Sequence, residues 1–326
     1  MRNFTFKGLL LTAVFMLLGC LSIQAANDDL ITKQITINLD KAGTLPNKIA
    51  SSEMYKITNL KIIGEINGTD WNMIREMAGR DNRGYGTEGK LSVLDLSEAK
   101  IVKGGDSYYP GDNCYTSNDE IGEKAFYDCS RLTSLTLPVG ITSIGYDAFA
   151  YCSGLTSLTL PAGITSIGEY AFYGCSGLTS LTLPAGITSI GDDTFYGCSG
   201  LTSLTLPAGI TSIGEFAFSY CSGLTSIYVY AEKVPRIGRY AFEGCASRKC
   251  TLYVPKGTYD NYRLSEFGYF ENIVEFDATG IDKTTTSTDV EEVSRYSLNG
   301  QRLVGPTKGL NIVKYSDGSV KKVAVQ

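Results

Sequence analysis

Residues 144–166 read IGYDAFAYCSGLTSLTLPAGITS, and a closely similar stretch recurs through the middle of the chain. A fixed period of this length is typical of stacked coils, in which each unit buries its apolar edge only against its neighbours. We therefore predict a solenoid, which offers a long surface rather than an enclosed pocket. The copies begin at Ile121, Ile144, Ile167, Ile190 and Ile213, each 23 residues after the last, and at Ile237 after a 24-residue step.

The leucines of one copy indicate which side of the coil is buried. Leu155, Leu158 and Leu160 have the L-x-x-L-x-L spacing of a leucine-rich repeat. In a short parallel strand Leu158 and Leu160 point inward, while Ser157 and Thr159 point outward. On the opposite side the Ala-Phe pair predicts a short helical or 3₁₀ turn. Stacking then predicts one column of buried phenylalanines: Phe126, Phe149, Phe172, Phe195, Phe218 and Phe242.

One cysteine occupies the same position in every coil, at Cys129, Cys152, Cys175, Cys198, Cys221 and Cys245. Many cysteines in an exported chain can indicate a disulfide framework. Side chains stacked in a column point the same way, however, which is poor geometry for disulfides. We therefore interpret the column as small apolar core residues. Whether Cys245 pairs with Cys250 remains open at this level.

The first residues resemble an export signal rather than part of the fold. Arg2 and Lys7 precede an apolar run from Gly8 to Gly19 that is too short to span a bilayer. We assign residues 1–26 as a signal peptide. Two processing routes stay open: lipidation of Cys20 within a lipobox-like Leu-Leu-Gly-Cys, or simple cleavage after Ala25 or Ala26. We expect an extracellular or outer-surface protein that touches a membrane only through a lipid on Cys20.

Degenerate copies of the repeat predict caps at both ends of the solenoid. Residues 27–120 form an amino-terminal cap, in which Asn67 begins a helix over Trp71 to Met77. Gly104 to Asn118 is expected to be a surface loop. Residues 121–276 contain the regular coils and an aromatic carboxyl-terminal cap.

A small separate unit follows the solenoid. Residues 277–289, with a Thr/Ser run, predict a linker. Residues 290–326 predict a small all-β unit of two hairpins that turn at Asn299-Gly300 and Asp317-Gly318. Two hairpins of this size should be only marginally stable alone.

The repeat resembles the BspA-like leucine-rich-repeat proteins. The resemblance rests on Ile-Gly-x-x-Ala-Phe-x-x-Cys followed by Leu-Thr-Ser-Leu-Thr-Leu-Pro, and it covers about Ile121 to Phe276. It implies a surface antigen or adhesin that binds host proteins or other cells. The final unit is similar to carboxyl-terminal sorting domains of surface proteins.

Composition excludes several functions. The chain has no histidine, so Ser-His-Asp catalysis, Cys-His catalysis and His-bearing zinc sites cannot occur. A net charge of −5 without a basic run disfavours nucleic acid as a partner. We predict no cofactor, no metal and a monomer.

Two surfaces are candidates for binding. The strand face repeats serine and threonine almost without change, so it carries little information for recognition. The positions that vary lie after Ile-Gly and after Ala-Phe, and they form an acidic edge rich in tyrosine. Our candidate binding residues on this edge are Tyr146, Asp147, Glu169, Tyr170, Tyr173, Asp192, Asp193, Tyr196 and Glu215. Tyr228 is a further candidate on the strand face, where it replaces the threonine of the earlier coils.

These features predict a non-catalytic binding or adhesion module for a host or bacterial surface protein. A polysaccharide that matches the hydroxyl and tyrosine columns is the alternative partner. A hydrolase that uses paired carboxylates is a third hypothesis, but that chemistry needs two carboxyl groups across a cleft. The identity of the ligand lies beyond the sequence.

Overall fold

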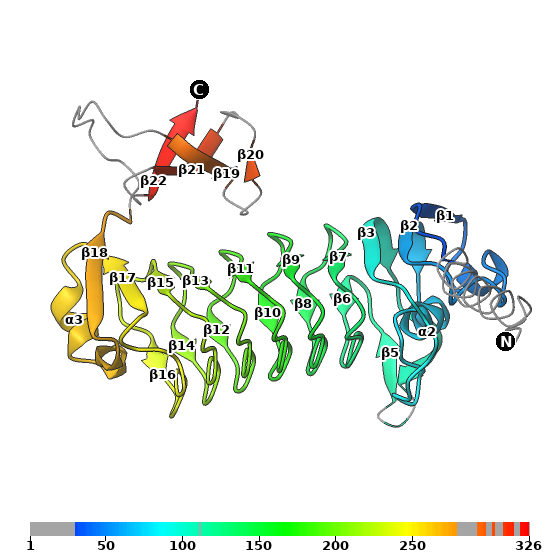
Figure 1. The fold of residues 1–326 in the computed structure, drawn as a ribbon, viewed down its shortest axis with the longest axis horizontal. Coiled ribbons are helices and arrows are strands. Elements are labelled where there is room, and N and C mark those ends of the chain that lie inside the picture. The colour runs from blue at the N-terminus through cyan, green and yellow to red at the C-terminus, as the bar shows by residue number, and fades with distance from the viewer. Residues whose placement is uncertain are drawn as a thin grey trace, which may run out of the picture.

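The computed structural model describes residues 30–109, 111, 113–278, 292–297, 302–303, 309–315 and 320–325. Its main body is a rod of stacked coils, as predicted (Figure 1). One side of the rod is a ten-stranded parallel sheet in which each coil adds one strand. In spatial order the strands are β1 (Ile35–Leu39), β2 (Asn59–Ile66), β3 (Val93–Ile101), β7 (Ser134–Thr136), β9 (Ser157–Thr159), β11 (Ser180–Thr182), β13 (Ser203–Leu206), β15 (Ser226–Val229), β17 (Thr251–Pro255) and β18 (Asn272–Phe276).

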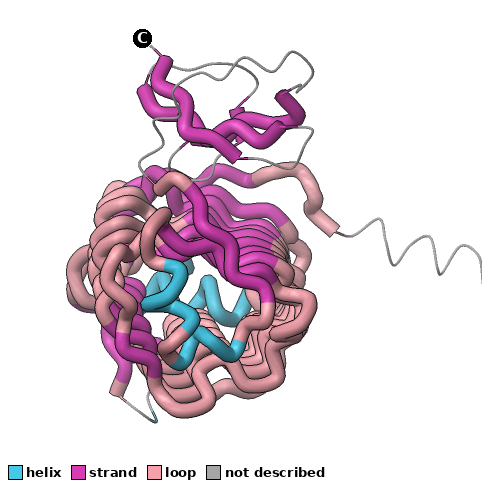
Figure 2. The backbone as a smooth tube through the Cα atoms, turned by 90° about the vertical axis from the view of Figure 1, so that its left-hand side faces the viewer, coloured by secondary structure: helices cyan, strands magenta, loops and turns pink. Residues whose placement is uncertain are grey.

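A second row of strands, which the sequence did not predict, runs along another side of the rod. It consists of two separate three-stranded parallel sheets. Seen along the rod, the successive coils superpose as one repeated outline (Figure 2). The first sheet contains β6 (Glu120–Ile121), β8 (Ser143–Ile144) and β10 (Ser166–Ile167), and the second contains β12 (Ser189–Ile190), β14 (Ser212–Ile213) and β16 (Arg236–Ile237).

The predicted phenylalanine column is confirmed and forms the centre of the core. All six rings are buried, and neighbouring rings stack with centroids 5.1–5.4 Å apart and planes 4–12° apart. The Ala-Phe segments are hydrogen-bonded turns and contain no helix. For example, the Phe149 amide donates to the carbonyl of Ala171 in the next coil at 2.7 Å. Backbone bonds between coils therefore continue where the strands end.

The cysteine column is also buried, and its thiols are free. Each thiol from Cys152 to Cys245 donates to a phenylalanine carbonyl of the preceding coil, as from Cys175 to Phe149 at 3.1 Å. The interpretation as core residues is thus confirmed. Cys245 and Cys250 are both free, which answers the question the sequence left open.

The amino-terminal cap closes the first coil with helix α2 (Gly68–Met77), which follows a short 3₁₀ turn, η1 (Leu45–Asn47). Asn67 caps the helix as predicted, in a capping box with Asp70. Trp71 packs on the ring of Phe126 with centroids 5.2 Å apart, and its indole N–H donates to the Ala125 carbonyl at 2.9 Å. The helix therefore supplies the partner that the end of the phenylalanine column requires.

The prediction of a surface loop over Gly104 to Asn118 was wrong. These residues contain a hairpin of β4 (Gly104–Tyr109) and β5 (Cys114–Thr116) that packs beside α2. Tyr108 is buried there, and its hydroxyl donates to the Glu123 carbonyl at 2.8 Å. The hairpin lacks the repeat period and is rich in glycine, so the pattern of residues carried no strand signal.

At the other end of the solenoid, the aromatic segment after β17 covers the last coil, as predicted. It contains α3 (Tyr259–Arg263), the 3₁₀ helix η3 (Glu266–Tyr269) and β18. Phe267 and Phe270 contact the ring of Phe242. The Tyr262 hydroxyl donates to the Ala231 carbonyl at 2.6 Å, so the cap is fixed by a buried hydrogen bond as well as by packing.

The carboxyl-terminal residues form a four-stranded antiparallel sheet in the order β20-β19-β21-β22. Its strands are β19 (Glu292–Ser297), β20 (Arg302–Leu303), β21 (Gly309–Tyr315) and β22 (Val320–Val325). The antiparallel pairs β19–β20 and β21–β22 correspond to the strands of the two predicted hairpins, whose turns lie outside the described residues. The signal peptide, Cys20 and most of the linker lie outside the described residues. Within the described part of the chain, no helix has the length and apolar character needed to cross a membrane.

Candidate functional site

The variable positions after Ile-Gly have an unusual backbone conformation in every coil. The second of the two residues has a φ between 52° and 58° in all six coils, although none of them is glycine. This left-handed conformation is uncommon for other residues. The residues are Lys124, Asp147, Tyr170, Asp193, Phe216 and Tyr240.

Bonds between coils maintain this conformation. The amide of Asp193 donates to the carbonyl of Glu215 in the next coil at 2.9 Å, and the same bond is present in each of the five coils before the last. The Asp192 side chain also accepts the Glu215 amide at 2.7 Å. The turn therefore holds its two variable side chains outward at a fixed place on each coil.

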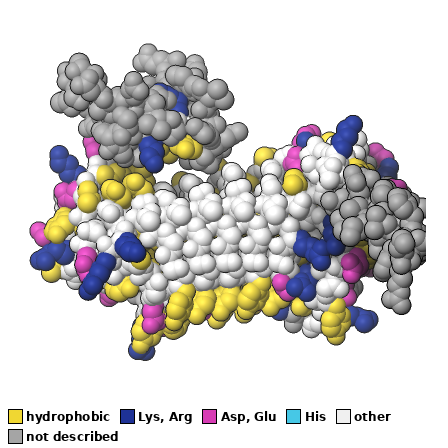
Figure 3. Space-filling model, in the orientation of Figure 1, with side chains coloured by type: hydrophobic (Ala, Val, Ile, Leu, Met, Phe, Trp, Pro, Cys, Tyr) yellow, Lys and Arg dark blue, Asp and Glu magenta, His cyan; other side chains and the backbone are white. Residues whose placement is uncertain are grey.

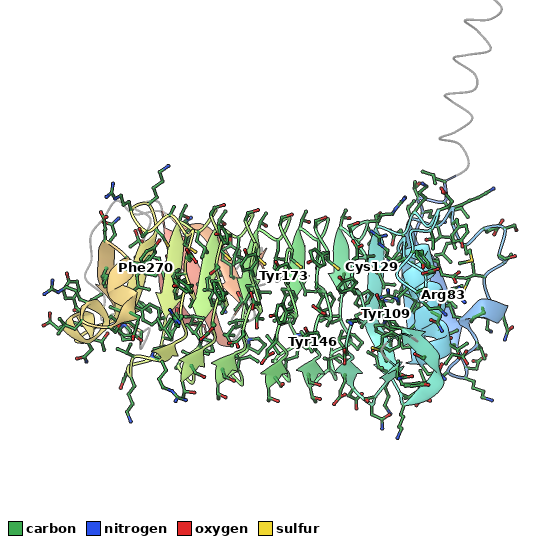
Figure 4. The ribbon with its side chains drawn as sticks, turned by 90° about the horizontal axis from the view of Figure 1, so that it is seen from below. Arg83, Tyr109, Cys129, Tyr146, Tyr173 and Phe270 are labelled. Atoms are coloured by element: carbon green, nitrogen blue, oxygen red, sulfur yellow. The ribbon has the colours of Figure 1, made fainter. Side chains whose placement is uncertain are left out.

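Tyrosines from these turns and from the Ala-Phe segments form a continuous row along the rod. Tyr173 and Tyr196 stack with centroids 4.8 Å apart and planes 2° apart, while most other neighbours meet at steep angles. Figure 4, seen from below, shows Tyr109, Tyr146 and Tyr173 on this side. We call it the tyrosine face and define it as Tyr109, Tyr127, Tyr146, Tyr151, Tyr170, Tyr173, Tyr196, Phe216, Tyr220 and Tyr240.

The rings of the tyrosine face are partly accessible to solvent. Tyr146, Tyr151 and Tyr220 are 42%, 44% and 50% exposed. The others in the central coils are half-buried. In the space-filling view, hydrophobic side chains gather along the lower edge of the coils (Figure 3). Large exposed aromatic areas of this kind mark interaction sites more often than chance exposure.

The predicted acidic residues lie among these tyrosines. Burial, and then the interaction with the Asp193 carboxylate, raise the pKa of the Tyr170 phenol to about 12. Burial and the neighbouring charges of Asp192 and Glu215 raise the pKa of Asp193. The structure thus brings Asp147, Glu169, Asp192, Asp193 and Glu215 together with Tyr146, Tyr170, Tyr173 and Tyr196 on one face.

The charge of the central coils is entirely negative. Residues 132–232 contain no lysine or arginine and six acidic residues. Five of the six lie among the rings of the tyrosine face, namely Asp147, Glu169, Asp192, Asp193 and Glu215, and the sixth is Glu232. The front of the coils shows no charged side chain (Figure 3). The tyrosine face therefore carries nearly all of the charge of this part of the rod.

At both ends of the tyrosine face, cations of the chain itself lie against tyrosine rings. The guanidinium of Arg75 and the ammonium of Lys124 each lie 5.3 Å from the centroid of Tyr109. The guanidinium of Arg239 lies 5.3 Å from the centroid of Tyr240. Tyr109 was missed from the sequence because it belongs to the hairpin that was expected to be a loop.

The structure separates Tyr228 from the other predicted site residues. It lies on the ten-stranded sheet, where it pairs in register with Thr205 and Tyr253. Its ring stacks on that of Tyr253 with centroids 4.4 Å apart. Tyr228 therefore lies on the strand face, as the sequence predicts, and apart from the acidic edge, which is built from turns.

Part of the hydroxyl pattern on the coils is structural. The hydroxyl of Thr179 donates to the carbonyl of Thr156 in the preceding coil at 3.1 Å, and Thr156, Thr202 and Thr225 make the same bond. This column links coils to one another. The outward Ser and Thr of the strands, such as Ser157 and Thr159, remain exposed in register.

The described residues offer no candidate metal site, and the cysteines of the column are not activated. The described part of the chain contains no group of three or more Cys, Asp or Glu that could hold a metal ion. Burial raises the pKa of the Cys129 thiol to about 11, and it raises the pKa of Cys152 and Cys175 as well. A nucleophilic cysteine needs the opposite shift.

Comparison with known proteins identifies the coils. Residues 119–249 match the family model described as a BspA type leucine rich repeat region, in six copies. This part of the chain is a BspA-type leucine-rich-repeat region, which confirms the resemblance inferred from the sequence. A repeat region of this type suggests a repeat-based binding module. A search of the curated proteins gave no match.

Three solved structures illustrate the similarity. A leucine-rich repeat protein of T. pallidum is 25% identical, with 45% of this chain and 76% of that chain covered and a TM-score of 0.34. A leucine-rich cell surface protein of Faecalibacterium prausnitzii is 21% identical (67% and 51% covered, TM-score 0.32). The pneumococcal vaccine antigen PcpA is 17% identical (68% and 57% covered, TM-score 0.39). The chain thus spans little more than half of the latter two proteins.

Proposed function

We propose that this chain, whose central coils are BspA-type leucine-rich repeats, is an exported surface protein that binds other proteins without catalysis. The tyrosine face is its binding site, and the partner presents lysine or arginine side chains to it. Export through the amino-terminal signal and attachment at the cell surface are part of this proposal. They are supported by the leader sequence and by the BspA-type repeats of the central coils.

The observation that carries the proposal is the distribution of cations along the tyrosine face. At its two ends, Arg75, Lys124 and Arg239 lie over tyrosine rings. The coils between these ends have the same rings and additional carboxylates, but no lysine or arginine of their own. A cation over a tyrosine ring contributes about 0.5–1 kcal/mol at an exposed site. Lysine or arginine side chains of a partner would lie over the tyrosine rings in the middle of the face. They would make there the same cation–ring contacts that the chain itself makes at the two ends.

Tyrosine suits this role for a second reason. It offers a large contact area at a small cost in side-chain entropy, and it is enriched at the centres of protein interfaces. The rings of Tyr173 and Tyr196 support each other through stacking, so binding need not order them. Carboxylates such as Glu169 and Glu215 then accelerate encounter with a basic partner at low salt.

A polysaccharide is the second candidate partner. The observation that favours it is the exposed row of serine and threonine in parallel register on β7, β9, β11 and β13. A ligand with its own repeat could bond to such a row. It would use the strand face, whereas the protein partner uses the tyrosine face.

The experiment that tests the proposal compares ligand classes. The mature chain is applied to an array of peptides that range from acidic to basic and to an array of neutral and charged glycans. Binding to basic peptides that weakens as salt is added supports the proposal. Binding confined to neutral glycans and insensitive to salt would overturn it.

A further inference from the structure

The strand face changes its chemistry abruptly at its carboxyl-terminal end. Along one row of outward residues, four coils carry threonine, and the next positions in register are Tyr228, Tyr253 and Val274. Val274 lies on β18, the last strand of the sheet, and is 45% exposed. A row of hydroxyls therefore becomes a row of apolar side chains within one step along the rod.

Two further rings extend this apolar area. Phe276 meets Tyr230 edge to face with centroids 5.0 Å apart, and it meets Tyr228 in the same way at 6.0 Å. Burial raises the pKa of Tyr228 to about 12 and also raises that of Tyr230. We call this group the exit cluster and define it as Tyr228, Tyr230, Tyr253, Val274 and Phe276.

The carboxyl-terminal sheet depends on a covering layer. Its described strands form one sheet of four strands, and a β-sheet is stable only when one face packs against another layer. One face carries Val313 and Arg295, which are paired across β19 and β21 and are both buried. Residues 292–326 are 35 in number, which is too few for a core that is stable alone.

Chain length favours the exit cluster as the covering layer. Phe276 belongs to the exit cluster, and only 15 residues separate it from Glu292, the first residue of β19. A random-coil linker of this length, as the sequence predicts, would have a mean span of roughly 20 Å and would give a local concentration in the millimolar range.

We propose that the sheet β19–β22 docks on the exit cluster of the same chain. The contact supplies a covering layer for the small sheet, and it covers the apolar end of the strand face. Because the sheet is tethered, even a weak interface is largely occupied. Tyr228 thus serves an intramolecular contact and not the recognition of a separate partner.

Amide hydrogen exchange of the intact mature chain tests this contact. The variant Y228T/Y253T/V274T continues the threonine row of the preceding coils, so it keeps a residue type that these strands already accept. We expect the amides of β19–β22 to exchange at least about tenfold faster in the variant, while those of β9–β13 stay unchanged. The matched control, Y173T/Y196T on the tyrosine face, should leave β19–β22 as protected as in the wild type.

Two results would overturn the proposal. One is equal protection of β19–β22 in the wild type and in the triple variant. The other is a concentration-dependent dimer by size-exclusion chromatography that the triple variant abolishes, since the occupant would then be a second copy. If the triple variant does not fold, V274T alone changes one exposed side chain of the last strand. It should still accelerate exchange in β19–β22 several-fold, and unchanged exchange would count against the contact.

Discussion

The Tyr170 phenol interacts with the Asp193 carboxylate of the next coil, and both residues have left-handed backbone conformations. The pair joins the two kinds of side chain that characterise the tyrosine face. It also couples neighbouring coils through their outermost atoms, at a place where backbone bonds already hold the turns together.

Removing the Asp193 carboxylate should change the titration of Tyr170. Its folded pKa of about 12 lies above the ordinary value of 10.0, so the phenol stays neutral where an ordinary tyrosine ionises. The favourable contribution is complete below pH 10 and is lost as the pH rises through about 12. In D193N we expect the pKa of Tyr170 to fall part of the way toward 10, because burial, the larger cause, remains. NMR titration of labelled tyrosine, with Y170F for assignment, measures this shift, and D192N should leave Tyr170 closer to the wild type.

A glycine makes room for one ring of the tyrosine face. A Cβ added at Gly174 would lie 3.2 Å from the Cδ1 carbon of Tyr151, whereas at Gly197 the nearest atom would be the Gly174 Cα at 3.8 Å. Both glycines have φ near 70°, so alanine costs about 1 kcal/mol or more of backbone strain at either position. We expect G174A to destabilise the fold more than G197A, as measured by chemical denaturation. Equal losses of stability in G174A and G197A would show that the Tyr151 ring does not depend on the space beside Gly174.

The interruption of the second row of strands coincides with one substitution in the repeat. Thr194 stands where the other five coils have alanine, and it is fully buried with its hydroxyl donating to the Gly191 carbonyl at 2.9 Å. We expect T194A to let β10 and β12 pair, so that the amides near Gly191 exchange more slowly. The converse change, A171T, should open a second interruption and cost about 1–3 kcal/mol through overpacking. Unchanged amide exchange near Gly191 in T194A would show that Thr194 does not cause the interruption between β10 and β12.

The thiols of the cysteine column should not react with thiol reagents or form disulfides in the folded protein. The thiols are buried, and the raised pKa of residues such as Cys129 leaves little thiolate at mildly alkaline pH. We expect a thiol reagent to label these cysteines only after denaturation, and a reducing agent to leave the melting temperature unchanged. A fall in melting temperature on reduction would instead show that disulfides form.

The sequence predicted most features that follow the repeat, but it missed the shortest strands and the parts of the chain that have no period. The Phe126-to-Phe242 column and the strands followed from the 23-residue period, because stacking brings equivalent residues together. The two-residue strands such as Ser143–Ile144 carry no alternation and could not be recognised. The hairpin that holds Tyr109 has no period, so its contribution to the tyrosine face was missed. The sequence placed Tyr228 correctly on the strand face, since it occupies the strand position of Thr205 in the preceding coil.

The central claim is that the tyrosine face binds a cationic protein partner, and charge neutralisation tests it most directly. Surface plasmon resonance compares the wild type with E169Q/D192N/E215Q for binding to an immobilised lysine-rich peptide at low salt. The D192N change keeps a side-chain oxygen that can accept the backbone amide of residue 215, so the fold should be preserved. The control S157A/S180A/S203A changes the strand face instead.

Our account predicts that the acidic-to-amide variant binds the peptide on the order of tenfold more weakly than the wild type, because three ion pairs of a few tenths of a kcal/mol to 1 kcal/mol each are lost. It predicts unchanged binding for the serine-to-alanine control. Undiminished binding by E169Q/D192N/E215Q, together with a loss of binding in the control, would contradict the account and assign recognition to the strand face.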